Sequence, residues 1–177
     1  MILFGHLGIT VGAVKAAEIA AKRKGRRPKI DYRFVLLGSI LPDLIDKPLG
    51  GALLRRFLHN TRLFAHSLLF SLSLLAAGFA RLRRRGDARL LLTGVGSAVH
   101  LALDSMWANP RTFFWPFLGL RFPRRREGRW TLEALRSLLH DASKIAAELA
   151  GLAILLFLFL RALRRRRLGQ FLRNGRL

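Results

Sequence analysis

The residues of this chain that could do chemistry are histidines and aspartates, and two pairs of them have helical spacing. His100 and Asp104 stand at i and i+4, and Asp43 and Asp46 stand at i and i+3. On a helix, side chains at these spacings project from one face. Carboxylates and neutral imidazoles together suit Zn, Mn, Fe or Mg rather than a soft metal. The two pairs therefore predict ligands of a divalent metal ion.

The absence of cysteine narrows the kind of metal site that is expected. The sequence contains no Cys, which excludes disulfides, thiolate ligands and cysteine nucleophiles. Structural zinc sites are usually closed by thiolates, so a site built from Asp and His alone is more often catalytic than structural. A cluster of this size could also hold two metal ions.

The remaining histidines differ in how strongly they indicate function. His66 stands inside an apolar run, where an unpaired polar group is expensive, which favours a functional role. His6, taken alone, is interpreted as an ordinary interfacial histidine, and His59 is balanced between the two interpretations. His140 and the adjacent Asp141 favour an ordinary helix end. Asp43 after Pro42 could be a helix cap, although a cap does not explain Asp46.

The segments that must position these residues are apolar runs suited to a membrane. A spanning helix needs about 20 mostly apolar residues. Residues 64–80, 88–107 and 148–163 are the strongest candidates, residues 34–45 form a short one, and residues 1–21 include Lys15 and Glu18. We therefore expect an all-α, polytopic helical bundle with about four to five membrane-embedded helices. It would be a single domain over 1–177, with its last transmembrane helix inside 131–167.

The strong positive charge fits the same interpretation. The chain has 32 Lys plus Arg against 10 Asp plus Glu, a net charge of +22. In a soluble protein this balance would suggest a nucleic-acid partner. A membrane-tethered nucleic-acid binder is the weakest of the three functions considered. The basic runs at 22–29, 81–85 and 164–167 abut apolar stretches, as Lys and Arg do on cytoplasmic sides of membrane helices. We expect a multi-pass protein of the cell membrane with a cytoplasmic C-terminus, anionic lipids as partners and no nucleic acid.

This orientation brings the rare polar residues to the outer side of the membrane. The aromatic stretch 113–122 would form an interfacial belt there, and the basic residues of 123–127 would meet anionic headgroups. Ionisable groups at membrane depth mark functional sites by default, so one metal site is expected at this face. The residues predicted on this side are His6, Asp43, Asp46, His59, His66, His100, Asp104, His140 and Asp141.

Five motifs give the chain a family resemblance. In order they are GHLGIT, GSILPDLID, RLFAHSLLF, VHLALD and FFWPF. Together they resemble the YdjM-type family of membrane-bound, predicted metal-dependent hydrolases, over roughly residues 1–120, with LPDxxD and AHSLLF as the most specific parts. The resemblance implies helical inner-membrane proteins with a metal site. Its residues here would be His6, Asp43, Asp46, His66, His100 and Asp104.

One motif departs from the family pattern. The family commonly shows His-Arg-Gly-x-Thr-His-Ser, which Arg62 and the His66-Ser67 pair fit. Thr61 stands where the earlier histidine would be, and Ala65 replaces the threonine. His59, two residues upstream of Thr61, is the available substitute, and the sequence leaves open whether it replaces the missing ligand.

The expected function is a metal-dependent hydrolase with its site near the outer membrane face. The substrate would be a phosphoester or a lipid-linked amphiphile, with Arg62 binding an anionic oxygen and His59 as a further catalytic candidate. The alternative is a non-catalytic protein that binds or transports a metal ion or a proton. Transport would need polar groups through the membrane, for which Lys15, Glu18 and Glu148 are the candidates.

Overall fold

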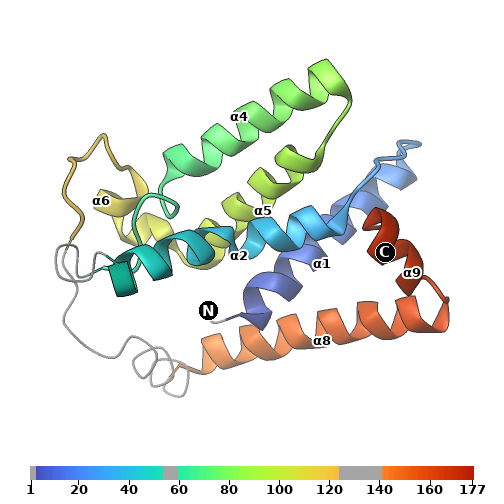
Figure 1. Cartoon of the computed structure of the whole chain (residues 1–177). Coiled ribbons are helices and arrows are strands. Elements are labelled where there is room, and N and C mark those ends of the chain that lie inside the picture. The colour runs from blue at the N-terminus through green and yellow to red at the C-terminus, as the bar shows by residue number, and fades with distance from the viewer. Residues whose placement is uncertain (1–2, 54–59, 124–140) are drawn as a thin grey trace.

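The computed structural model describes residues 3–53, 60–123 and 141–177, and every regular element in these ranges is helical (Figure 1). The predicted all-α class is therefore confirmed. The five long helices are α1 (Phe4–Arg23), α2 (Tyr32–Pro48), α4 (Leu68–Arg85), α5 (Arg89–Leu103) and α8 (Ala142–Arg164). The short elements are η1 (Leu49–Leu53), η2 (Met106–Ala108), α6 (Pro110–Phe113) and α9 (Leu168–Asn174).

The long helices alternate in direction between two ends of the molecule (Figure 1). We use the name cluster end for the end at which α1, α4 and α8 begin and at which α2 and α5 finish. The opposite end holds the basic runs 22–29, 81–85 and 164–167, and we call it the basic end. Chain direction thus reverses at each step, as the sequence predicts.

One helix in the described ranges, α8, is long and apolar enough to cross a membrane. It has 23 residues, and only 17% of its most apolar stretch is buried. The apolar helix α5 has 15 residues, α2 has 17, and α4 finishes in a run of arginines. Length and composition alone therefore support one span rather than the four to five expected.

Glycines allow the helices to pack closely. A methyl group on Gly8 of α1 would overlap the backbone of Gly151 of α8. A methyl group on Gly38 of α2 would likewise overlap the backbone of Thr93 of α5, and one on Gly78 of α4 would overlap the backbone of Leu91 of α5. Small residues that let backbones approach are typical of helix interfaces in membranes, where hydrophobic burial supplies no force between helices.

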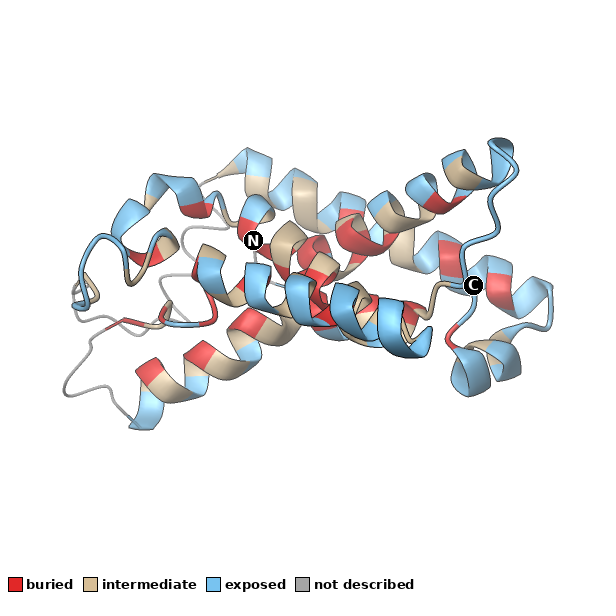
Figure 2. Ribbon diagram, turned by 90° about the horizontal axis from the view of Figure 1, so that it is seen from above, coloured by how far each residue is buried: buried red, intermediate tan, exposed pale blue. Residues whose placement is uncertain are grey.

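Among the described residues, more of the buried side chains are polar or charged than apolar, and many large apolar side chains are exposed. Buried positions are red and exposed ones pale blue in Figure 2. A small apolar cluster of Val11, Tyr32, Val35 and Leu158 forms the core. On α8, Leu149, Leu156 and Phe157 are exposed, each by more than half. The buried polar and charged residues are His6, Thr10, Glu18, Ser39, Asp46, Asn60, His66, Ser67, Ser71, Thr93, Ser97, His100 and Thr112.

Aspartate and serine side chains fix where three long helices begin. Asp31, Ser67 and Asp141 accept hydrogen bonds from backbone N–H groups in the first turns of α2, α4 and α8, which stabilises helix starts. The reading of Asp141 as a helix-end residue fits this geometry. The reading of Asp43 as a helix cap is wrong, because α2 begins at Tyr32 and Asp43 lies inside it.

Candidate metal centre

The cluster end brings together five of the predicted ligands from different parts of the fold. His6 comes from α1, Asp43 from α2, His66 from the connection before α4, His100 from α5, and Asp104 from the residue that ends α5. Potential ligand atoms of His6, His100 and Asp104 lie within 4.8 Å of one another, as do those of Asp43, His66 and His100. The two groups share His100.

Asp46 organises the connection that carries His66. Residues 60–67 of this connection are not helical, so their buried N–H groups need acceptors. The Asp46 carboxylate accepts from the backbone nitrogens of Leu63, Ala65 and His66 at 2.6, 3.1 and 3.1 Å. Asp46 is completely buried. Its charge is therefore satisfied by the loop that it holds.

Hydrogen bonds to the two buried imidazoles set which ring nitrogen carries the proton. His66 Nδ1 lies 2.8 Å from Asp46 Oδ2, and His100 Nδ1 lies 2.7 Å from the carbonyl oxygen of Ser39. A carboxylate and a carbonyl can only accept, so both Nδ1 atoms donate. In the neutral rings both Nε2 atoms then keep their lone pairs, which is how metal-binding histidines are oriented.

Three acceptor atoms consequently face one another. The Nε2 atoms of His66 and His100 are 3.4 Å apart, and Asp43 Oδ1 lies 3.5 Å from the first and 4.0 Å from the second. Ligand atoms about 2.1 Å from a tetrahedral ion lie roughly 3.4 Å apart. Acceptors at these distances repel one another unless a cation lies between them. The donor set and its spacing therefore fit a divalent metal ion.

The other oxygen of Asp43 is held from the solvent side. Lys47 Nζ lies 2.6 Å from Asp43 Oδ2, and about a third of the Lys47 side chain is exposed. This ion pair leaves Oδ1 directed toward the two histidines. Asp43 and Lys47 therefore lie between the buried histidines and the solvent.

The second group lies on the other side of His100. The His6 ring stacks on the His100 ring with centroids 4.1 Å apart, and His6 Nε2 lies 3.2 Å from Asp104 Oδ1. His6 is only 2% exposed, and its Nδ1 has no hydrogen-bond partner in the described ranges. Arg62 Nη2 donates to Asp104 Oδ2. A quarter of the Arg62 side chain remains exposed.

The predicted site residues fall into three sets. Those that the fold gathers are His6, Asp43, His66, His100 and Asp104, with Arg62 attached through Asp104. Asp46 is adjacent but belongs to neither ligand group, because its oxygens bind the His66 loop. His59, His140 and the basic residues 124–126 lie outside the described residues.

Sequence reasoning missed three groups that shape the site. Lys47 had a usable signal, since it stands at i+4 from Asp43. Asn60 accepts from the backbone nitrogen of Arg62 and donates to the carbonyl of Pro123, which ties two distant segments together. The carbonyl of Ser39 has no sequence signal, because any residue type supplies a carbonyl.

Comparison with protein-family models gives a match over most of the chain. A family model described as YdjM inner membrane protein matches residues 1–168. The match extends beyond the motifs of residues 1–120 and includes α8. No curated protein and no solved structure gives a significant match.

Proposed function

The chain belongs to the YdjM inner membrane protein family, and from this premise we propose that it is a membrane-embedded, metal-dependent hydrolase. The observation that carries the proposal is the convergence of His66 Nε2, His100 Nε2 and Asp43 Oδ1, which are three acceptors when both rings are neutral. Zn, Mn, Fe and Mg are the candidate ions for this donor set. A bound ion would supply Lewis acidity, which activates water and polarises a scissile bond.

The chain's own residues divide the remaining work. Asp43, His66 and His100 would hold the ion, while Asp46 and the Ser39 carbonyl orient the two imidazoles. His6, paired with Asp104 through Nε2 and stacked on His100, would be the general base, because its Nδ1 has no hydrogen-bond partner in the described ranges. Asp104 would also hold Arg62 where its free N–H groups can bind an anionic oxygen of the substrate.

The whole chain is proposed to form one multi-pass membrane domain. A polar interior beneath an apolar surface suits lipid rather than water as the surroundings. With the basic end in the cytoplasm, the metal centre would face the outer side. Trp107, Phe117 and Leu120 at that end are each more than half exposed, as expected of residues at headgroup level. A phosphoester or lipid-linked substrate would reach the site from there.

The transport alternative is less well supported, because its three candidate residues have structural partners. Glu18 pairs with Lys15 at 2.8 Å and with Lys22 at 2.6 Å, and accepts from the Tyr32 hydroxyl. Glu148 accepts from the backbone nitrogens of Leu3 and Gly5, at the start of α1. These residues lie at opposite ends of the molecule, so they do not line a path.

Metal content tests the proposal directly. The detergent-purified protein should carry close to one equivalent of a divalent metal by inductively coupled plasma mass spectrometry, and EDTA should remove it. Asp43→Asn and His100→Gln should each lower metal occupancy by about tenfold or more, since each removes a ligand. Asp141→Asn is the matched control, because Asn is an equally good helix cap there. Near-zero metal in the wild type, even after metal is added back, would overturn the metal centre.

Hydrolysis separates the enzyme from a metal-binding protein. The metal-loaded protein should release phosphate or alcohol from phosphoester and lipid-phosphate substrates, and EDTA should abolish the release. His6→Gln should keep the metal but lose at least about a hundredfold in rate, as for removal of a general base. A metal-loaded wild type that hydrolyses none of these substrates would favour the non-catalytic alternative.

A further inference from the structure

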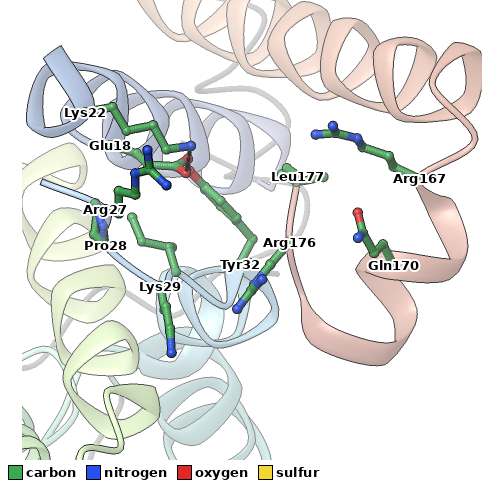
Figure 3. A pocket seen from close by; sticks show the side chains of 11 residues that line it. Glu18, Lys22, Arg27, Pro28, Lys29, Tyr32, Arg167, Gln170, Arg176 and Leu177 are labelled. Atoms are coloured by element: carbon green, nitrogen blue, oxygen red, sulfur yellow. Dashed lines mark hydrogen bonds and ion pairs between the residues drawn. The ribbon is translucent and has the colours of Figure 1, made fainter. Parts of the chain in front are cut away.

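The basic end contains a cavity that the metal centre does not use. Its volume is about 380 Å³, within the range of small-ligand sites. Three segments enclose it: the last turns of α1, the connection 24–31 with the start of α2, and the chain after α8 (Figure 3). It is therefore formed only when the tail packs against the first two helices.

The lining of this cavity is strongly basic. Arg27, Lys29, Arg167 and Arg176 all contribute side chains. None of the four pairs with a carboxylate among the residues that the structure describes. Gathering like charges around one cavity is unfavourable in the free protein and is relieved when an anion enters.

The one acidic side chain in the lining is already neutralised. Glu18 is held by Lys15, Lys22 and the Tyr32 hydroxyl, and Figure 3 shows it beside Lys22 and Tyr32. Tyr32 is almost completely buried, so this network forms the fixed inner wall of the cavity. The unpaired cations above it remain available to a ligand.

The position of the tail has its own fixed contacts. The backbone nitrogen of Tyr32 donates to the carbonyl of Gly175 at 2.7 Å, and Arg33 donates to the carbonyl of Leu172 at 2.8 Å. These bonds tie the segment that carries Arg176 to the start of α2. The backbone that carries Arg176 is therefore fixed against α2, while the four cationic side chains themselves are exposed and can reach a ligand from solvent.

We propose that this cavity binds a phosphate group. Arginine forks match the several oxygens of a phosphate in paired hydrogen bonds. The cavity lies at the finish of α8, where the headgroups of the cytoplasmic leaflet would lie, and basic pockets between helices on that side bind anionic headgroups. The same chemistry would accept a soluble phosphate compound. The inference does not depend on the hydrolase proposal.

The test measures binding to the full-length protein in a neutral detergent with EDTA, so that a metal at the other end cannot hold the anion. Inorganic pyrophosphate and short-chain phosphatidic acid are titrated calorimetrically, with short-chain phosphatidylcholine as the zwitterionic control. The wild type should bind at least one of the two anions with a Kd below 1 mM, and phosphatidylcholine at least about tenfold more weakly. Tighter binding of phosphatidic acid would identify a lipid headgroup, and tighter binding of pyrophosphate a soluble ligand.

Charge-matched variants distinguish a site from general attraction. Arg27→Gln with Arg176→Gln should weaken anion binding by about tenfold or more, because two charge-assisted contacts are lost. Arg84→Gln with Arg85→Gln removes the same charge from the same end of the molecule, on α4 and outside the cavity, and should leave the Kd within about twofold of the wild type. Equal losses in the two double variants, or no anion binding by the wild type, would overturn the proposal.

Discussion

At the scale of residues, two aspartates from one motif do different work because they have different neighbours. Asp46 is fully buried and accepts from three backbone N–H groups and from the His66 ring. Asp43 is partly exposed, pairs with Lys47 and directs its free oxygen toward two imidazoles. The first arrangement organises a loop, and the second suits a metal ligand.

This difference predicts opposite patterns for the two Asn variants. Asp46→Asn should lower the stability of the metal-free protein by about 3 kcal/mol, because an amide nitrogen would face backbone donors in a buried site. Asp43→Asn should change it by about 1 kcal/mol or less, since only a partly exposed ion pair is lost. Thermal unfolding in EDTA, followed by circular dichroism, measures both. Equal destabilisation by the two changes would contradict the assigned roles.

At the scale of elements, two kinds of contact set the arrangement of the helices. Glycines allow backbone contact, as between Gly8 of α1 and Gly151 of α8. Polar groups fix the ends, as where Glu148 of α8 accepts from the first residues of α1. The helix α1 also contacts α2 and α5, and there its His6 ring stacks on the His100 ring of α5.

Adding one methyl group to a glycine tests the close approach. Gly151→Ala should destabilise the protein by about 1–3 kcal/mol, because the new Cβ would overlap the backbone of Phe4. Gly169→Ala on α9 is the matched control, since nothing lies within 4 Å of the added Cβ. It should be neutral or stabilising by up to about 1 kcal/mol through helix propensity. Melting curves in detergent would refute the close contact if both variants behaved alike.

The start of α2 predicts a dependence on pH. The hydrogen bond from the Arg33 guanidinium holds the pKa of Asp31 below its ordinary value. Its stabilisation is therefore present above about pH 4 and is lost as the pH falls below that. Asp31→Asn keeps the cap but removes this contribution. The melting temperature of the variant should be lower than that of the wild type at pH 6, and the gap should narrow progressively as the pH falls below about 4. A constant gap would show that the ionised carboxylate is not responsible.

At the scale of the whole molecule, the two ends have different chemistry. Buried histidines and aspartates gather at the cluster end, and three basic runs gather at the basic end (Figure 1). This follows from helices that alternate in direction. If the molecule lies across the inner membrane with the basic end in the cytoplasm, the two proposed sites serve opposite faces.

The absence of native cysteine makes this orientation easy to test. Ser143→Cys at the start of α8 and Asn174→Cys at the end of α9 place one exposed thiol at each end. In intact spheroplasts, a membrane-impermeant maleimide should label the first, and the second only after permeabilisation. Labelling of both from one side would rule out an α8 that crosses the membrane, and the reverse pattern would invert the proposed orientation.

The sequence by itself determined the helical class and the residue types of the candidate site. Apolar runs with basic stops predict helices of alternating direction, because this pattern is local. Spacing alone paired His100 with Asp104 and Asp43 with Asp46, the apolar run around His66 marked that histidine, and the family motifs added His6. A histidine inside an apolar run can be recognised from the sequence alone as a candidate functional residue.

Only the tertiary structure decided how these residues share the work. His66 precedes α4 rather than lying in it, so Asp46 is needed to hold its loop and turn its ring. His100 is oriented by the backbone of Ser39, which carries no mark in the sequence. The basic cavity likewise needs a tail folded back on α1 and α2. Contacts between segments far apart in the chain depend on how the helices pack, and the spacing of residues within one segment does not predict that packing.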